Sequence, residues 1–315
     1  MAQGLSTYDQ LYRAIMLRCP AASVWLSRQW IDFAFRTLWD RRLWSWQRKR
    51  SQFLFPALVS SGLVTVVHGD PHVIGIGTSW TTDQVTSQFR IGLQTPIYTI
   101  ASVDPVGQTL ELTEPWGANS ATAVGYKIYL AYVTVPTDFQ SMIAVYDPNF
   151  SWRLLQNVSQ EDLDLWDAQR ATQGTPAWVM SPYTFDTVNN PPLFMYECWP
   201  HVQQQYVLVH LYTSRPPDLS DPGASLPRGI RGDVLLEMAL AQCARWPGPS
   251  RDQPNPYFNL GLAQQHDSRA ERGIMDMERT DDETAETDVW YHSITSAPWA
   301  SFPFGDSRYL QSHDW

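Results

Sequence analysis

Several short motifs in the chain contain the residue types of catalytic or ligand-binding sites. The segment Gly75-Ile76-Gly77-Thr78 has glycines like those of a phosphate-binding loop. It lacks the GK[ST] ending and the third glycine of a dinucleotide fingerprint. It therefore predicts a bulge or a tight turn, with Trp80 packing nearby as an anchor. We expect no bound cofactor.

Two histidines near this segment raise the question of a metal site. His68 and His72 flank Asp70, but Gly69 and Pro71 make the segment a turn rather than a helix that presents both imidazoles to one ion. The three cysteines, Cys19, Cys198 and Cys243, lie far apart without a CxxC pair. They are expected to be core thiols rather than zinc ligands or a disulfide framework.

The sequence offers little for hydrolytic chemistry. It has no GxSxG elbow and no HExxH motif, and no cysteine in a recognisable active-site segment. Glu111 and Glu114 precede Trp116 and could form a carboxylate pair for glycoside cleavage. Their place within an alternating strand and turn favours solvated edge charges instead. We therefore expect a protein that is not an enzyme.

Arg231-Gly232-Asp233 spells a cell-adhesion triplet. Asp233 is also placed to cap the helix predicted after it, because a carboxylate accepts hydrogen bonds from the free N–H groups of a first turn. No secretion signal is expected from the first residues, so the cap is the preferred interpretation.

A cluster of cations follows the first tryptophans. Between residues 36 and 50 there are six cations and one acid. Cations stabilise a helix C-terminus, which is one interpretation of the cluster. The other is a contact with an acidic partner surface or with passing DNA phosphates. The candidate interface residues in this cluster are Arg41, Arg42, Arg48, Lys49 and Arg50.

The overall charge limits the partners. A formal net charge of −10 argues against coating nucleic acid, because phosphate binding needs a basic face. Twenty arginines stand against two lysines, which suits an interface-rich protein, although a GC-rich genome gives the same ratio. No stretch is apolar enough for a spanning helix, so no membrane partner is expected.

Periodicity predicts an α+β fold in four segments. Residues 1–50 read as two helices, 8–17 and 20–48, and residues 51–136 read as a small antiparallel β-sandwich or barrel. In it, strands 97–103 and 109–113 form a hairpin, and Tyr126, Ile128, Leu130 and Tyr132 share a face.

Residues 137–283 read as a mixed segment ending in two late helices. We expect a helix at 138–146, a strand at 151–157, a helix from Ser159 to Arg170 and strands at 177–180, 193–199 and 203–212, the last two as a hairpin. The late helices are expected at 233–245 and 256–281. Residues 284–315 read as an extended arm whose aromatic side chains need a partner surface. Those proposed as interface residues are Trp290, Tyr291, Trp299, Phe302 and Phe304.

This order of segments resembles a known family. The segments HVIGIGTSW (72–80), QFRIG (88–92), YTIASVD with LELTEPW (98–116), GYKIY (125–129), VPTDF (135–139) and the late helix (255–277) are similar to neck proteins of tailed bacteriophages. These head-to-tail adaptor (connector) proteins are similar in role to the tail tubular proteins of short-tailed phages. The resemblance covers roughly residues 5–285.

The resemblance implies a structural virion protein. It implies a homo-oligomeric ring, a dodecamer, in the virion neck, docked under the portal protein and joined to a tail or nozzle protein. Genomic DNA passes through its axial channel without sequence-specific binding, and assembly takes place in the host cytoplasm. A ring requires two different complementary patches on each subunit. The alternatives are a tail-associated glycan-binding module using Trp80 or Trp116, and a cell-wall hydrolase.

Overall fold

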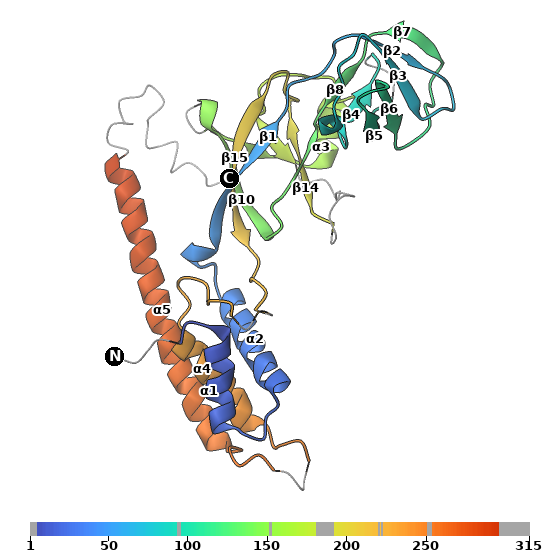
Figure 1. Ribbon diagram of the computed structural model, residues 1–315. Coiled ribbons are helices and arrows are strands. Elements are labelled where there is room, and N and C mark those ends of the chain that lie inside the picture. The colour runs from blue at the N-terminus through green and yellow to red at the C-terminus, as the bar shows by residue number, and fades with distance from the viewer. Residues whose placement is uncertain are drawn as a thin grey trace. The chain divides into compact units, whose positions relative to one another are not determined.

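The computed structural model describes residues 5–92, 96–150, 153–180, 192–219, 221, 223–250 and 254–295. The chain divides into two compact units (Figure 1). The helical unit comprises Met1–Arg48 and Arg215–Trp315, and the strand unit comprises Lys49–Ser214. The mixed α+β class with helices near the C-terminus agrees with the sequence prediction.

The helical unit consists of α1 (Tyr8–Arg18), α2 (Val24–Asp40), α4 (Gly232–Arg245) and α5 (Leu260–Thr295). Figure 1 shows α4 beside the first half of α5, and α1 and α2 pack against α4. A single apolar core joins them, because each helix places its buried stripe against the others. Its largest fully buried side chains are Tyr8, Leu11, Ile15, Ile31, Phe35, Leu38 and Trp44.

The first helix was predicted correctly, but the second is shorter than predicted. The Ser23 hydroxyl accepts a hydrogen bond from the backbone N–H of Leu26, so α2 begins after Pro20 and not at it. The helix ends at Asp40. Beyond it, the indole of buried Trp44 donates to the carbonyl of Leu38, and this bond ties the residues after the helix to its last turn. A short 3₁₀ turn, η1 (Ser45–Gln47), then leads into strand β1 (Arg48–Phe55).

Two four-stranded sheets form a sandwich in the strand unit. One has the order β1-β15-β10-β11, with β15 (Tyr206–Ser214), β10 (Phe139–Asp147) and β11 (Arg153–Leu154). The other has the order β12-β13-β14-β9, with β12 (Gln156–Asn157), β13 (Trp178–Met180), β14 (Met195–Trp199) and β9 (Tyr132–Thr134). Both sheets contribute to one apolar core. A helix, α3 (Gln160–Asp167), follows β12.

Three predictions for this part of the chain are wrong. Residues 138–146 form most of strand β10, which pairs antiparallel with β15, and not a helix. The strands predicted as a hairpin across residues 200–202 exist, but β14 and β15 lie in different sheets. The predicted strand at 151–157 is likewise split between β11 and β12, in different sheets. Non-local pairing decides most of these outcomes, because β10, β12 and β14 pair with strands from distant segments, whereas β11 pairs with the neighbouring β10.

A seven-stranded antiparallel sheet forms the second part of the strand unit. Its order is β7-β2-β3-β6-β5-β4-β8. The strands are β2 (Leu63–Val66), β3 (His72–Ile76), β4 (Gln88–Arg90), β5 (Tyr98–Asp104), β6 (Thr109–Leu112), β7 (Ala121–Val124) and β8 (Lys127–Tyr129). The predicted hairpin of β5 and β6 is confirmed. The predicted single strand around residues 126–132 is divided, because β8 belongs to this sheet and β9 to the sandwich.

Strand pairing crosses the segment boundaries that the sequence suggested. β1 and β9 come from the first 136 residues but pair with β15 and β14 from the later part of the chain. The division into segments 1–50, 51–136, 137–283 and 284–315 stays a prediction.

The late helices lie where the sequence predicted them, with two differences at their ends. Arg231 is the N-cap residue of α4, and Asp233, in the first turn, binds the Arg231 side chain instead of capping the helix. α5 continues past the predicted end to Thr295, so residues 284–295 are helical and not extended. Residues 296–315, with Trp299, Phe302 and Phe304, lie outside the described residues.

Candidate interaction surface of the helical unit

The first two candidate cations lie directly after α2 and bind α5. The Arg41 guanidinium donates to Glu278 and to Glu271, each at 2.9 Å, and Arg42 donates to Asp282 at 2.6 Å. The three acids follow one another at intervals of seven and four residues, which places them along one helix face. The two arginines therefore clamp the end of α2 to α5 of the same chain.

The clamp is only partly shielded from water. The side chains of Arg41 and Arg42 are 34% and 32% exposed. The hydrogen bond to Glu271, together with that to Glu278, raises the pKa of Arg41, and the Arg42 bond lowers the pKa of the exposed Asp282 carboxyl. Both shifts favour the charged forms, so the ion pairs persist throughout the neutral range.

A third acid of α5 is buried beside the clamp. Asp281 is 7% exposed, and both of its oxygens accept the backbone N–H of Ser45 at 3.1 Å. The Ser45 hydroxyl donates to the same carboxylate. The Arg42 guanidinium lies 3.6 Å from it and also packs over the Trp44 ring, at 5.3 Å. Asp281 thus fixes the η1 turn against α5.

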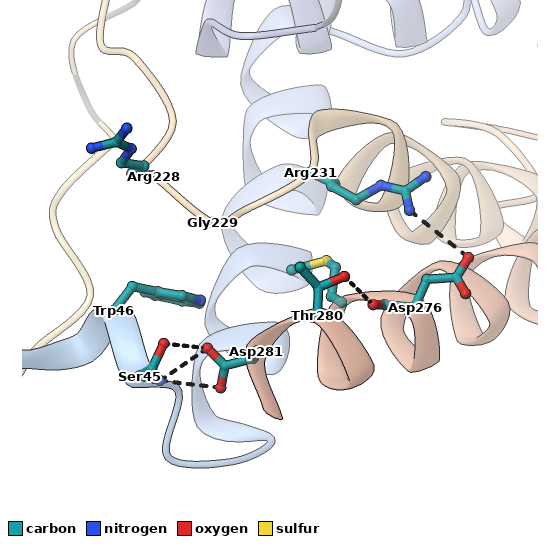
Figure 2. A pocket seen from close by; sticks show the side chains of 9 residues that line it. Ser45, Trp46, Arg228, Gly229, Arg231, Asp276, Thr280 and Asp281 are labelled. Carbon is teal, nitrogen blue, oxygen red and sulfur yellow. Dashed lines mark hydrogen bonds and ion pairs between the residues drawn. The ribbon is translucent and has the colours of Figure 1, made fainter. Parts of the chain in front are cut away.

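A pocket of about 400 Å³ opens next to this contact (Figure 2). It is lined by Ser45, Trp46, Arg228, Gly229, Arg231, Asp276, Met277, Thr280 and Asp281. Gly229 has a φ of +98°, and a Cβ there would lie 2.5 Å from Cδ1 of Trp46. Only glycine allows the loop to approach the indole so closely.

The pocket combines an apolar floor with charged walls. Trp46 stacks on Trp44, with ring centroids 5.6 Å apart, and Met277 is buried beneath. Arg231 binds Asp233 at 2.5 Å and lies 4.0 Å from Asp276, and Arg228 is exposed. These groups can hold a side chain that has an apolar body and a polar end, and they do not form a nucleophile with an adjacent base.

The other three candidate cations lie on strand β1. Arg48, Lys49 and Arg50 are all exposed. The Lys49 ammonium lies 2.5 Å from Asp138. Burial opposes ionisation of Asp138, but hydrogen bonds from Lys49 and Tyr212 hold its pKa below the usual range. The predicted cation cluster is therefore divided between two elements.

The candidate aromatics fall at the end of α5 and beyond it. Trp290 and Tyr291 are residues of α5. Trp299, Phe302 and Phe304 lie outside the described part of the chain. Their role at an interface stays a prediction.

The motifs that contain residue types of catalytic sites have structural roles in this fold. Gly77 adopts a φ of +64° in a turn after β3, and a Cβ on Gly75 would lie 2.9 Å from the Trp80 ring, as the bulge-or-turn prediction requires. His72 lies 2.7 Å from Asp70, and His68 faces the carbonyl of Ala118. In the described ranges, no group of three or more His, Cys, Asp or Glu side chains could hold a metal ion.

The tryptophans proposed as sugar platforms are buried. Trp80 and Trp116 are each 1% exposed and belong to the core of the seven-stranded sheet. The Trp80 indole donates to the Tyr126 hydroxyl at 2.9 Å. A stacking platform must present a ring face to solvent, so the expectation that these two rings hold glycans is wrong. All three cysteines are buried and free, as predicted.

The sequence did not reveal the residues that fix α5 to the rest of the helical unit, nor the pocket beside them. Asp281 is one of a run of acids, and nothing in the local pattern distinguishes it from its exposed neighbours. The only local signal for the pocket was Gly229 after Arg228, a glycine in a loop rich in proline. The partners of Arg41 lie more than 200 residues away in sequence, which no periodicity reveals.

None of the described helices is both long enough and apolar enough to cross a membrane. A search of curated proteins returned no match. A family model described as SU10 adaptor protein, a phage adaptor family, matches residues 111–295, well over half of the chain. The match runs from β6 to the last residue of α5 and includes the pocket-lining part of that helix. The chain therefore belongs to the SU10 adaptor protein family and is a structural adaptor protein of a bacteriophage.

Proposed function

We propose that this protein is the head-to-tail adaptor subunit of a phage neck, forming a ring between the portal and the tail and leaving an axial channel for DNA. The observation that carries the proposal is the family match, which spans most of the sandwich and both late helices. A dodecamer is the ring size that the resemblance to neck proteins implies.

A neck subunit performs no covalent chemistry, so its function depends on its surfaces. A closed ring needs head-to-tail contacts between two different patches of each copy. The net charge of −10 per subunit suits a channel wall that does not retain DNA, because like charges repel within the Debye length of about 8–10 Å.

The helical unit is the part we assign to the portal. Its surface carries large apolar side chains that a free protein would normally cover: Leu17 is 86% exposed, Trp25 is 67% exposed and Phe33 is 57% exposed. α5 has 36 residues and is therefore about 54 Å long. We assign Trp290, Tyr291, Trp299, Phe302 and Phe304 to the contact with the portal or with a neighbouring subunit.

Within this proposal the five cations have two roles. Arg41 and Arg42 hold α5 in position through their ion pairs. The exposed part of each side chain, 34% for Arg41 and 32% for Arg42, remains available to a partner. Arg48, Lys49 and Arg50 are exposed on β1 and contact a neighbouring subunit.

The test compares the full chain with a chain ending at Glu283, each added to assembled, tail-less heads that carry the portal. The full chain should form a ring at the portal vertex in electron micrographs. The truncated chain should remain folded, with an unchanged circular dichroism melting curve for the strand unit, but should not dock. Normal docking of the truncated chain would remove the proposed role of α5's end and the following segment. Failure of the full chain to bind the vertex would contradict the adaptor function.

A further inference from the structure

The outer face of the seven-stranded sheet is unusual for a surface. Strand register places Leu63 opposite Ile76 and Thr65 opposite Ile74. The alternate residues of these strands, such as Val64 and Val73, point inward and are fully buried. The outward set must therefore face solvent in the isolated chain.

Apolar side chains dominate one half of this face. Leu63 is 41% exposed, Val67 49%, Ile74 51% and Ile76 48%. The solvent face of an antiparallel sheet normally carries polar residues. Four adjacent, half-exposed aliphatic side chains are typical of a surface that another protein covers.

Acids occupy the other half of the same face. Across the strands, Ile74 lies opposite Thr109, and Thr109 lies opposite Asp104. In the same way, His72 lies opposite Glu111. Glu111 accepts a hydrogen bond from Ser102 at 2.9 Å, and both acids are exposed. We call Leu63, Val67, Ile74, Ile76, Asp104 and Glu111 the acidic face.

A second face of the strand unit has the opposite charge. On the edge strand β1, Phe53 and Phe55 point into the sandwich core, so Arg48, Arg50, Gln52 and Leu54 point outward. Leu54 is 55% exposed, and Leu154, on the other edge strand of the same sheet, is 43% exposed. We call Arg48, Arg50, Leu54 and Leu154 the basic face.

We propose that the acidic face of one copy packs on the basic face of the next copy, and that this contact closes the ring. Each face carries exposed apolar side chains and charges of one sign, and the two signs are opposite, which favours this pairing over contact between like faces. The two faces are different surfaces of one unit, and Figure 1 shows β2 and β3 at the end of the unit away from β1. This is the arrangement that a head-to-tail contact requires.

The inference rests on the proposed adaptor ring and assigns its intersubunit surfaces. It assigns Arg48 and Arg50 an intersubunit contact of defined chemistry, namely with the carboxylates at positions 104 and 111 of a second copy. It also assigns a function to β2, β3 and β5, which lie outside the family match.

Charge exchange tests the contact directly. One variant carries Asp104→Arg and Glu111→Arg, and the other carries Arg48→Glu and Arg50→Glu. Each variant alone should form rings on portal-bearing heads at least about tenfold less efficiently than the wild type, because like charges then meet at every contact. A mixture of the two should restore rings in which the variants alternate, because every contact again joins opposite charges.

The matched control uses an exposed acid of the strand unit outside both faces, Asp83→Arg. This control should form rings like the wild type, and melting curves should show that all variants are folded. As a second measurement, a mixture of Ile74→Cys and Leu54→Cys chains should form a disulfide-linked dimer on heads under mild oxidation, whereas Val106→Cys with Leu54→Cys should not.

The outcomes separate the inference from the proposed function. If wild-type rings form and the variants assemble normally, the two faces are not the contact, and the adaptor function stands. If each variant fails and the mixture also fails, the faces bind other virion components, and the inference is wrong. Absence of wild-type rings at the portal would overturn both.

Discussion

The Arg41 ion pairs of the helical unit and the Glu197 network of the strand unit differ in burial. In the helical unit, Arg41 and its partners Glu271 and Glu278 are all partly exposed. In the strand unit, Glu197 is 1% exposed and accepts from Arg170 at 2.8 Å, with His201 at 3.3 Å. The comparison predicts where a charge can be removed with little loss of stability. Surface pairs contribute little to stability, whereas a buried charge that loses its partner is costly.

The largest expected effect is at Glu197. Glu197→Ala leaves the Arg170 guanidinium, which is 11% exposed, with Asp164 as its remaining carboxylate. We expect a loss of about 3 kcal/mol in the free energy of unfolding, measured by urea denaturation. Glu197→Gln keeps the volume and an acceptor oxygen and should lose less. An exposed counterpart in the helical unit, Asp267→Ala, should change stability by less than about 1 kcal/mol. Equal losses at the two sites would remove the contrast between the units.

A second prediction concerns pH and His210. This residue is fully buried between Phe53 and Tyr212, and burial lowers its pKa from 6.5 to about 4. Below pH 6.5 the unfolded chain binds a proton that the folded chain excludes, so stability falls as the pH drops from 6.5 to 4. The full loss corresponds to about 3 kcal/mol.

His210→Phe keeps a ring in the stack and removes the titrating group. The variant loses the contact with the Ser51 hydroxyl, so its stability at pH 7 should be slightly lower. Its stability should nevertheless be nearly constant between pH 6.5 and 4, whereas the wild type declines. The pKa of Asp138 is lowered, so its contribution is lost mainly below this window. A parallel decline in both proteins would show that another group titrates.

A smaller effect is expected at Asp281 in the helical unit. Asp281→Ala removes the acceptor of the Ser45 N–H group, so stability should fall by about 1–3 kcal/mol. Asp281→Asn keeps one acceptor oxygen and should recover part of the loss. Asp282→Asn, one residue away, removes only an exposed ion pair with Arg42, so this matched control should leave the melting temperature close to that of the wild type.

The smallest effect is expected at the clamp. Arg41→Ala removes two exposed ion pairs and should cost at most about 1 kcal/mol in low salt. Screening should reduce the difference from the wild type further at 1 M salt, where the Debye length is about 3 Å. Arg41→Lys is the conservative control. A loss as large as that of Glu197→Ala would show that the clamp is as important as the buried network.

Elements with strong local signals could be predicted from sequence. The turn formers between β5 and β6 predict their hairpin, and Ser159 with Asp162 predicts the start of α3, where the hydroxyl accepts from the Asp162 N–H at 3.1 Å. The helix at α4 also has enough apolar periodicity to be found. In each case the stabilising contacts lie within a few residues of one another.

The remaining features depend on contacts between distant segments. The residues FQSMIAVYD have no clear period, and their pairing with β15 makes them a strand. Trp44 is fully buried within its own unit, where its indole donates to the carbonyl of Leu38. Likewise, Arg41 and Arg42 can be recognised as a cationic cluster, but their acids on α5 cannot be identified without the fold.

The most direct test of the adaptor function is electron cryo-microscopy of portal-bearing heads incubated with the full chain. The account predicts a closed ring of this protein at the portal vertex, with the seven-stranded sheet of each copy against β1 of its neighbour. Heads whose portal vertex stays bare, or protein bound at another site of the particle, would contradict it.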